Sequence, residues 1–275
     1  MSDQERRSTG FQVEESAAEA YEEYVVPILF APWAERLVDR ADLQEGDRVL
    51  DVACGTGIVA RRTAARVGDG AIVAGLDINE EMLAVAEQTA ADADLPIEWR
   101  LGDAADLPFP DECFDVVFCQ QALQFFDDPT AALVEMRRVL TPTGRMISSV
   151  WRPIEYQGGN FVVAEGMERH GHHEAAEEVR SPYPTWDRDY LHTIALEAGF
   201  GDVSITIEID SERYPSIEEF VEVWLAATPL AELPEAEVQT IREELVQDVT
   251  TELDDYTDDA GVVFPNESSI IMARQ

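Results

Sequence analysis

Short apolar segments alternate with amphipathic helical segments through the middle of the chain, and this alternation constrains the fold more than any other feature. The expected strands are apolar along most of their length: 48–52, 71–76, 97–101, 114–119 and 145–151. Helical patterns separate most of them, as at 59–66 and 129–140. Continuous apolar strands of this kind are typical of a parallel sheet covered by helices on both faces. We therefore predict an α/β fold, Rossmann-like and doubly wound.

The pattern changes after residue 151. Val203, Ile205, Ile207 and Ile209 alternate with polar residues, and this period of two predicts a half-exposed, antiparallel strand. Residues 269–273 form a final short strand, with helical segments before it. We expect a mostly parallel, seven-stranded sheet with an antiparallel last strand, with helical insertions after the fifth strand and between the last two.

A glycine-rich turn, Gly55-Thr56-Gly57, follows the first strand and opens a helix. Glycines there let the backbone turn tightly and approach a ligand, and the helix N-terminus faces the same ligand. The turn also fits the pattern G-x-G-x-x-A through Ala60, and Asp77 lies twenty residues beyond Gly57. Both features are expected of an NAD site, so the turn alone permits a nicotinamide-dependent oxidoreductase.

Three carboxylates favour a different ligand. Asp51 ends the first strand, where it would repel a pyrophosphate but can accept a hydrogen bond from an ammonium group. Asp77 ends the second strand and Asp103 the third, which suits a ribose diol and an adenine amino group. The antiparallel closing strand is also foreign to the six-stranded parallel NAD sheet.

Several ordered segments resemble the class I S-adenosylmethionine-dependent methyltransferases (methyltransferase type 11), in the small-molecule branch that includes enzymes of ubiquinone and menaquinone biosynthesis. The matching segments share the order and spacing of the family motifs: 49–57, 75–79 with Met82-Leu83, 102–109, 114–117 and 138–145. The resemblance covers roughly Tyr21 to Trp151. It implies S-adenosylmethionine as cofactor, S-adenosylhomocysteine as product and a small-molecule methyl acceptor.

The resemblance also implies roles for individual residues. Four residues of the turn would contact the methionine part of the cofactor: Asp51, Ala53, Gly55 and Gly57. Asp77 would bind the ribose hydroxyls. The adenine would be flanked or held at its edge by four more: Ile78, Met82, Asp103 and Ala104. Three others would lie near the carboxylate or methyl group, or fold over the site: Gln120, Tyr21 and Tyr24.

On this basis residues 1–275 form a single methyltransferase domain. Its expected parts are a disordered tail (1–10), an N-terminal helical cover (11–45), the cofactor-binding core (46–151), acceptor-side insertions with strand six (152–262) and the final strand (263–275). Pro27 and Pro32 are expected to interrupt the helical cover. A non-catalytic scaffold that binds S-adenosylmethionine remains an alternative to an enzyme, and the acceptor atom can be O, N or C.

No general base stands out, and the weak catalytic candidates are His170, His173 and Tyr156. His170 and His173 belong to a histidine cluster that Gly171 interrupts. A solvated turn is the favoured interpretation of that cluster over a metal site, so no metal is expected.

The charge balance limits the partners. The chain has 57 acidic against 19 basic residues, a net charge of −38, and every basic residue is Arg. This balance disfavours nucleic-acid and anionic-membrane binding and resembles proteins from salt-loaded, haloarchaeal cytoplasm. Arg61, Arg62 and Arg66 are expected to pair with carboxylates. No signal-peptide pattern and no apolar run of about 18 residues is visible, so a cytoplasmic protein is expected.

Overall fold

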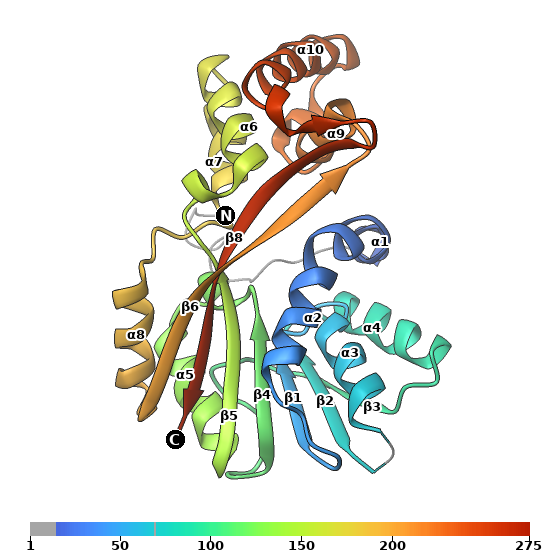
Figure 1. Cartoon of the computed structure of the whole chain (residues 1–275). Helices are drawn as coiled ribbons and strands as arrows, with labels where there is room; N and C mark the ends of the chain where they lie inside the picture. Colours follow the sequence, from blue (N-terminus) through green and yellow to red (C-terminus); the bar gives the residue numbers. More distant parts are fainter. Residues whose placement is uncertain (1–14, 69) are drawn as a thin grey trace, which may run out of the picture. The chain divides into compact units, whose positions relative to one another are not determined.

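Across residues 15–68 and 70–275, which the computed structural model describes, the strands form one eight-stranded sheet in the order β3-β2-β1-β4-β5-β8-β6, with β7 paired to β8 (Figure 1). The strands that follow one another in the first half of the chain are β1 (Arg48–Val52), β2 (Ile72–Asp77), β3 (Ile97–Leu101), β4 (Phe114–Gln120) and β5 (Leu140–Trp151). Four parallel pairings, β1 with β2, β1 with β4, β2 with β3 and β4 with β5, join them.

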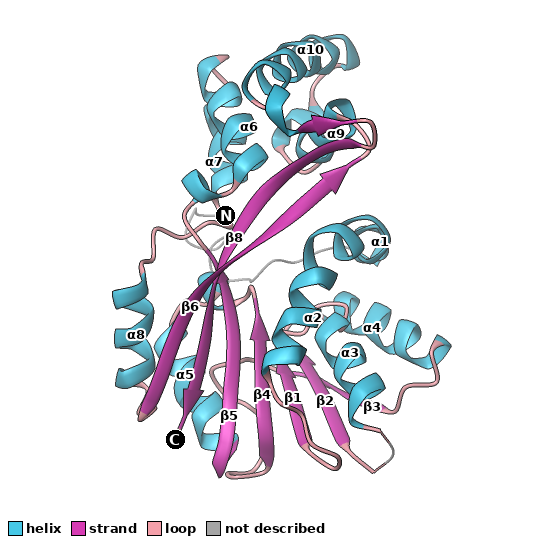
Figure 2. Ribbon diagram, viewed as in Figure 1, coloured by secondary structure: helices cyan, strands magenta, loops and turns pink. Residues whose placement is uncertain are grey.

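Strands β6 (Asp202–Tyr214) and β8 (Gly261–Arg274) are longer than the strands expected at 203–209 and 269–273. The two-residue β7 (Thr257–Asp258) was not predicted, and it makes eight strands where seven were expected. Strand β8 lies between β5 and β6 in the sheet order and runs opposite to both (Figure 2). The predicted fold class, a mostly parallel Rossmann-like sheet with an antiparallel closing strand, is therefore confirmed.

Two compact units make up the chain. The first comprises Met1–Val150, Asp187–Ile207 and Ser269–Gln275, and the second comprises Trp151–Trp186 and Glu208–Ser268. The helices of the first unit are α1 (Glu15–Ala20), η1 (Tyr21–Phe30), α2 (Ala31–Arg40), α3 (Ile58–Val67), α4 (Glu80–Asp92), η2 (Leu123–Phe125), α5 (Pro129–Val139) and α8 (Arg188–Glu197). The helices of the second unit are η3 (Ile154–Tyr156), α6 (Gly158–Arg169), α7 (His173–Arg180), α9 (Ile217–Ala226), η4 (Pro229–Glu232), α10 (Glu235–Glu252) and η5 (Asp254–Tyr256). The assignment of the whole chain to a single methyltransferase domain stays a prediction, and the expected tail at 1–10 lies outside the described residues.

The N-terminal cover is helical from Glu15 to Arg40 without a break, so the expected interruptions at Pro27 and Pro32 were wrong. Pro32 lies in the first turn of α2, directly after η1, and the helix continues through it. Pro27 lies inside η1, a ten-residue π-helix whose wider turn differs from the α-helix in which proline is disruptive.

Side-chain caps fix the first residues of several helices. The Asn79 side chain accepts hydrogen bonds from the amides of Glu81 and Met82 at the start of α4. Ser216 accepts from the Glu219 amide at the start of α9. These caps satisfy amides that have no partner inside the helix, which places each helix start at a defined residue.

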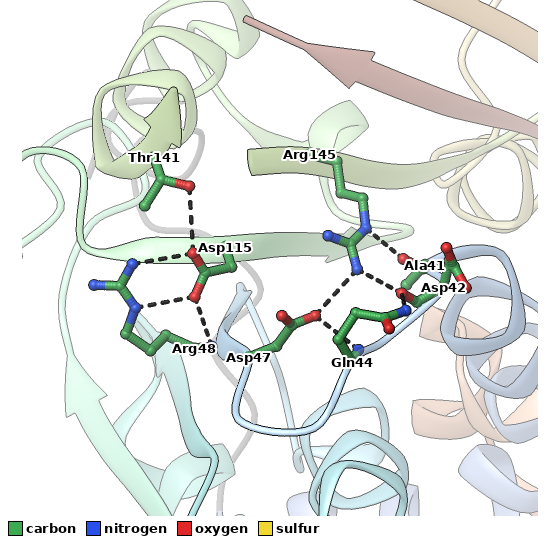
Figure 3. Close-up of polar contacts among 8 residues, drawn as sticks. All are labelled: Ala41, Asp42, Gln44, Asp47, Arg48, Asp115, Thr141 and Arg145. Atoms are coloured by element: carbon green, nitrogen blue, oxygen red, sulfur yellow. Dashed lines mark hydrogen bonds and ion pairs between the residues drawn. The ribbon is translucent and has the colours of Figure 1, made fainter. Parts of the chain in front are cut away.

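Charged side chains brace the amino-terminal ends of the central strands (Figure 3). Arg48, the first residue of β1, donates to both carboxylate oxygens of Asp115 at 3.0 Å and so holds the pKa of Asp115 below its ordinary value. Arg145 of β5 donates to the Asp42 carbonyl at 2.8 Å and to the Asp47 carboxylate at 3.1 Å. This brace ties α2 and the following loop to one end of the sheet and leaves the carboxyl ends of the strands for a site.

None of the helices at 15–68 and 70–275 combines the length and apolar character needed to cross a membrane.

Candidate functional site

The loop after β1 takes a backbone conformation that few residues adopt. Ala53, Gly55 and Gly57 all have positive φ, at 54°, 54° and 85°. Ala53 is the strained member, because a left-handed conformation costs an L-residue about 1 kcal/mol or more. Two backbone hydrogen bonds hold the loop: the Cys54 amide donates to Leu76 at 3.0 Å, and the Gly57 amide donates to Cys54 at 2.8 Å.

Trp99 of β3 lies so close to two glycines that neither tolerates a side chain without movement. A Cβ on Gly57 would lie 2.4 Å from the indole, and a Cβ on Gly75 of β2 would lie 2.3 Å from it. The glycines therefore serve close packing as well as the turn. The sequence pattern identified both glycines as motif residues, but it carried no signal that Trp99 was the side chain they accommodate.

Asp51, at the end of β1, is almost completely buried, with 1% of its surface exposed. One carboxylate oxygen accepts a hydrogen bond from the Ala60 amide in the first turn of α3 at 3.0 Å. Burial raises the pKa of Asp51 to about 8, and nearby Asp77 adds to the rise, while the Ala60 amide and Arg61 oppose it. Asp51 thus satisfies a first-turn amide of α3, and its carboxylate would be stabilised by a cation placed beside it.

Asp77, at the end of β2, links two loops. Its Oδ2 accepts a 2.7 Å hydrogen bond from the Gly55 amide, and its Oδ1 accepts a 2.9 Å hydrogen bond from the Asn79 amide. Burial raises the pKa of Asp77, and these backbone hydrogen bonds oppose the rise. The helix cap of α4 is Asn79 and not Asp77, so the Asp77 carboxylate is directed toward the glycine loop.

Gln120 at the end of β4 is buried, and only one end of its amide is satisfied by the protein. Its Nε2 donates to the Phe30 carbonyl of η1 at 2.9 Å. Its Oε1 is buried and accepts no hydrogen bond within the described part of the chain. Buried acceptors without a donor are rare in folded proteins, so this oxygen fits a site in which a ligand supplies the donor.

The two tyrosines expected to fold over the site, Tyr21 and Tyr24, differ in burial and in position. The Tyr21 side chain is half-buried, and its pKa is raised first by burial and then by the Asp77 carboxylate, which places it near the site. Tyr24 is 64% exposed, and a hydrogen bond with Glu23 is the main cause that raises its pKa. The structure therefore brings Tyr21 to the acidic site and leaves Tyr24 at the surface of η1.

The residues expected around the adenine lie just after β2 and β3 and, for Met82, in the first turn of α4. Ile78 presents an exposed apolar side chain, whereas Met82 and Ala104 are buried. Asp103 is exposed, and its Oδ1 accepts a 2.8 Å hydrogen bond from the Ala105 amide, which leaves its Oδ2 available. An apolar surface beside an exposed carboxylate suits a flat base with an amino group.

Arg61 of α3 is a site residue that sequence analysis did not single out. Its guanidinium donates to the Thr56 carbonyl inside the glycine loop and to the Glu22 carboxylate of η1. Arg62 and Arg66 pair instead with exposed carboxylates on α2. Pairing of all three arginines was predicted and is confirmed, but only the fold shows that one of them reaches the loop.

The catalytic candidates lie in the second unit. His170 Nε2 lies 3.0 Å from Asp248 Oδ2, and His173 Nδ1 lies 2.8 Å from Glu168 Oε1. The Arg152 guanidinium stacks 3.5 Å from the centre of the Tyr156 ring. Among the residues that the structure describes, no group of three or more His, Cys, Asp or Glu side chains is arranged to hold a metal ion.

A buried polar network also lies inside the second unit. Glu212 Oε1 accepts a 2.6 Å hydrogen bond from Asn266, and Oε2 accepts one of 3.1 Å from Tyr214. Asn160 donates to the Tyr183 hydroxyl at 2.9 Å. Burial raises the pKa of Glu212, while its hydrogen bonds lower it. Because both carboxylate oxygens are engaged by the protein, we assign this network to the internal structure of the second unit.

Comparison with known proteins identifies similar chains. A family described as "Methyltransferase domain" matches residues 50–148. The ubiquinone/menaquinone biosynthesis C-methyltransferase UbiE of Neisseria meningitidis is 34% identical over 183 residues, which cover 62% of this chain and 74% of that protein. The UbiE of Chromobacterium violaceum is 36% identical over 183 residues, with the same coverage of 62% and 74%.

Solved structures share the fold. A SAM-dependent methyltransferase from Aquifex aeolicus has a TM-score of 0.54 and 22% identity, and the match covers 70% of this chain and 92% of that chain. A phosphoethanolamine N-methyltransferase from Haemonchus contortus, solved with phosphomonomethylethanolamine and S-adenosylhomocysteine, has a TM-score of 0.56 and 20% identity. That match covers 96% of this chain and 60% of the other.

Proposed function

The chain belongs to the S-adenosylmethionine-dependent methyltransferases, and we propose that it transfers the methyl group to a ring carbon of a small quinol-type acceptor. This proposal has a donor half, binding of S-adenosylmethionine, and an acceptor half, the molecule that is methylated. The donor half is supported by the pair of buried carboxylates, Asp51 and Asp77, at the glycine loop. The acceptor half rests on the relatives, which are named as C-methyltransferases of quinone biosynthesis. Transfer to an O or N atom of another small molecule is the alternative that the test below separates.

We assign the donor contacts as follows. Asp51 faces the ammonium group of the cofactor, since a buried carboxylate with a raised pKa gains most from a neighbouring cation. Asp77 accepts from the ribose hydroxyls through lone pairs that its backbone donors, such as Gly55 and Asn79, do not use. The unsatisfied Gln120 Oε1 takes a donor from the amino-acid end of the cofactor. Gly55 and Gly57 let the backbone approach it closely.

On the adenine side, Ile78 and Met82 flank the base. The free Oδ2 of Asp103 accepts from the adenine amino group, and buried Ala104 borders the edge of the base. Tyr21 closes the site from η1, whereas exposed Tyr24 contributes less to binding.

The bound cofactor supplies a strongly electrophilic sulfonium methyl group. The protein then has to align donor and acceptor in line and exclude water, and this alignment lowers the barrier to methyl transfer. A carbon acceptor must also lose its ring proton. His170, His173 and Tyr156 are the candidates for the base that takes this proton.

The donor half is tested by calorimetric titration of the folded protein with S-adenosylhomocysteine in molar KCl. The wild type should bind, and Asp77→Ala should weaken binding by about tenfold or more, as expected for loss of a charged hydrogen-bond acceptor. Asp92→Ala is the matched control, because Asp92 is an exposed acid at the end of α4. Folded wild type that binds NADH and not S-adenosylhomocysteine would instead support the oxidoreductase.

The acceptor half is tested by transfer of labelled methyl from S-adenosylmethionine to a demethylated naphthoquinol, with product analysis by mass spectrometry. Label on the ring carbon supports the proposal, and label on oxygen contradicts it. Cofactor binding without turnover on any quinol supports the scaffold alternative. His170→Ala, His173→Ala and Tyr156→Phe in the same assay show whether any of the three acts as the base.

A further inference from the structure

The Arg61 side chain joins two segments that are far apart in the sequence. Its Nη1 donates to the Thr56 carbonyl, in the middle of the glycine loop, and its Nη2 donates to Glu22 Oε1 on η1. The Arg61 and Glu22 side chains are only 10% and 21% exposed. One guanidinium therefore connects the loop that follows β1 with the N-terminal helical cover.

The burial of Arg61 contrasts with its neighbours on the same helix. Arg62 and Arg66 keep 49% and 40% of their side chains exposed and pair with Glu35 at the surface. Burial lowers the pKa of Arg61, and the Glu22 carboxylate acts against that lowering. A buried charge is tolerated only when partners engage it, so the contacts to Thr56 and Glu22 are what keep this guanidinium inside.

The helix η1, which Arg61 contacts through Glu22, also approaches the site at Tyr21 and Phe30. Tyr21, next to Glu22, lies close enough to Asp77 for that carboxylate to raise its pKa. At the other end of η1, the Phe30 carbonyl accepts the hydrogen bond from Gln120. The π-helix is thus tethered to α3 through Glu22 and to the carboxyl end of β4 through the Phe30 carbonyl.

We propose that Arg61 is a positioning residue for the methyl donor. Its hydrogen bonds to Thr56 and Glu22, which we call the latch, hold η1 against the glycine loop. This inference rests on the proposed function of the loop as the donor site. The Thr56 contact fixes a loop in which Ala53, Gly55 and Gly57 all have positive φ, and the Glu22 contact fixes the cover. Loss of the Arg61 guanidinium would therefore release the glycine loop and η1 together.

The positive charge of Arg61 also favours binding of the methyl donor, through its effect on Asp51. The groups that face Arg61 are Glu22 on η1, Asp51 on β1 and Arg62 on its own helix, and Asp77 of β2 acts on Asp51. Arg61 lowers the pKa of Asp51, whereas burial and Asp77 raise it. Without the guanidinium, Asp51 holds its proton to higher pH, and a neutral carboxyl attracts the cofactor ammonium less strongly.

The test uses Arg61→Gln, Arg61→Lys and Glu22→Gln, with Arg62→Gln as the matched control from the same helix. Two readouts are compared in molar KCl: the dissociation constant for S-adenosylhomocysteine and the hydrogen-exchange rates of amides in η1. Arg61→Gln and Glu22→Gln should both weaken binding by about tenfold and speed exchange in η1. Arg62→Gln should leave both at wild-type values.

The Lys variant separates charge from bridging, because an ammonium keeps the charge but lacks the fork that joins two acceptors. We expect Arg61→Lys to raise the amide exchange rate in η1 while keeping the wild-type pH dependence of the dissociation constant. In Arg61→Gln, tight binding of S-adenosylhomocysteine should begin at a higher pH than in wild type. If Arg61→Gln fails to fold, Glu22→Gln, which keeps the Thr56 contact, still tests the latch. Wild-type binding and exchange in Glu22→Gln would overturn it, whereas absent binding by wild type would overturn the proposed function.

Discussion

Asp77 Oδ2 accepts a 2.7 Å hydrogen bond from the Gly55 amide, so the residue that ends β2 directly holds the glycine loop that follows β1. The other oxygen is engaged by Asn79 at 2.9 Å. Parallel pairing of β1 with β2 brings these two strand ends together. The residue proposed to bind ribose is therefore also part of the support of the loop, and its substitution affects both functions.

We expect Asp77→Asn to destabilise the cofactor-free protein as well as to weaken S-adenosylhomocysteine binding. An amide has one oxygen, so its NH2 group must face one of the two backbone N–H groups that Asp77 now accepts from. An unsatisfied buried amide costs about 1–3 kcal/mol of unfolding free energy. Denaturant unfolding measures this loss, with Asp92→Asn as control. Unchanged stability would show that the Gly55 contact contributes nothing.

Asp51→Asn should stabilise the cofactor-free protein at alkaline pH and at the same time weaken its binding of S-adenosylhomocysteine. Burial raises the pKa of Asp51 from 3.8 to about 8, so between these values the folded state keeps a proton that the unfolded state has lost. The contribution of this group to stability therefore falls as pH rises through that window. An amide has no proton to lose, so the variant should be stabler than wild type at pH 8.5, by on the order of a few kcal/mol.

The stability advantage of Asp51→Asn should shrink at pH 5.5, and its affinity for S-adenosylhomocysteine should fall at both pH values. Thermal melting of the cofactor-free proteins at the two pH values measures the first effect, and calorimetry measures the second. A variant that is less stable than wild type at both pH values would contradict the raised pKa.

Gly75→Ala tests the packing under the loop. The new methyl group would lie 2.3 Å from Trp99, which is the lateral partner of Gly75 in the sheet, so the indole or the strand must move. Overpacking of this kind costs about 1–3 kcal/mol. The cost should decrease when Trp99→Leu is added. Gly201→Ala is the control, because its nearest neighbour would be 3.6 Å away. Equal losses in the single and double variants would show that Trp99 is not responsible.

The net charge of −38 predicts that stability depends strongly on salt. At low ionic strength the charges repel across about 30 Å, and at 1 M salt the screening length falls to about 3 Å. Exposed ion pairs such as Arg66–Glu35 offset little of this repulsion. The melting temperature should rise steeply from millimolar to molar KCl, and NaCl should act equally if screening is the cause. A high, cooperative melting transition at low salt would refute the prediction.

Much of the fold could be predicted because its signals are local. Apolar runs such as 48–52 specify strands, and side-chain caps such as Asn79 specify where helices begin. The interruption expected at Pro27 was wrong, because η1 accommodates the proline in a π-helix. The full length of β6 was also missed, since it continues to Tyr214, beyond the stretch in which apolar and polar residues alternate. The short strand expected at 269–273 is the end of the longer β8.

The sequence alone determined the parallel core, the glycine loop and the placement of Asp51 and Asp77 at strand ends, because parallel strands present their carboxyl ends at one edge. Only the tertiary structure decided that Asp51 is buried deeply enough to raise its pKa, that Asp77 holds Gly55, and that Arg61 reaches Glu22. Burial depth and contacts between distant residues depend on how the elements pack. No local pattern encodes a pair separated by 39 residues, as Arg61 and Glu22 are.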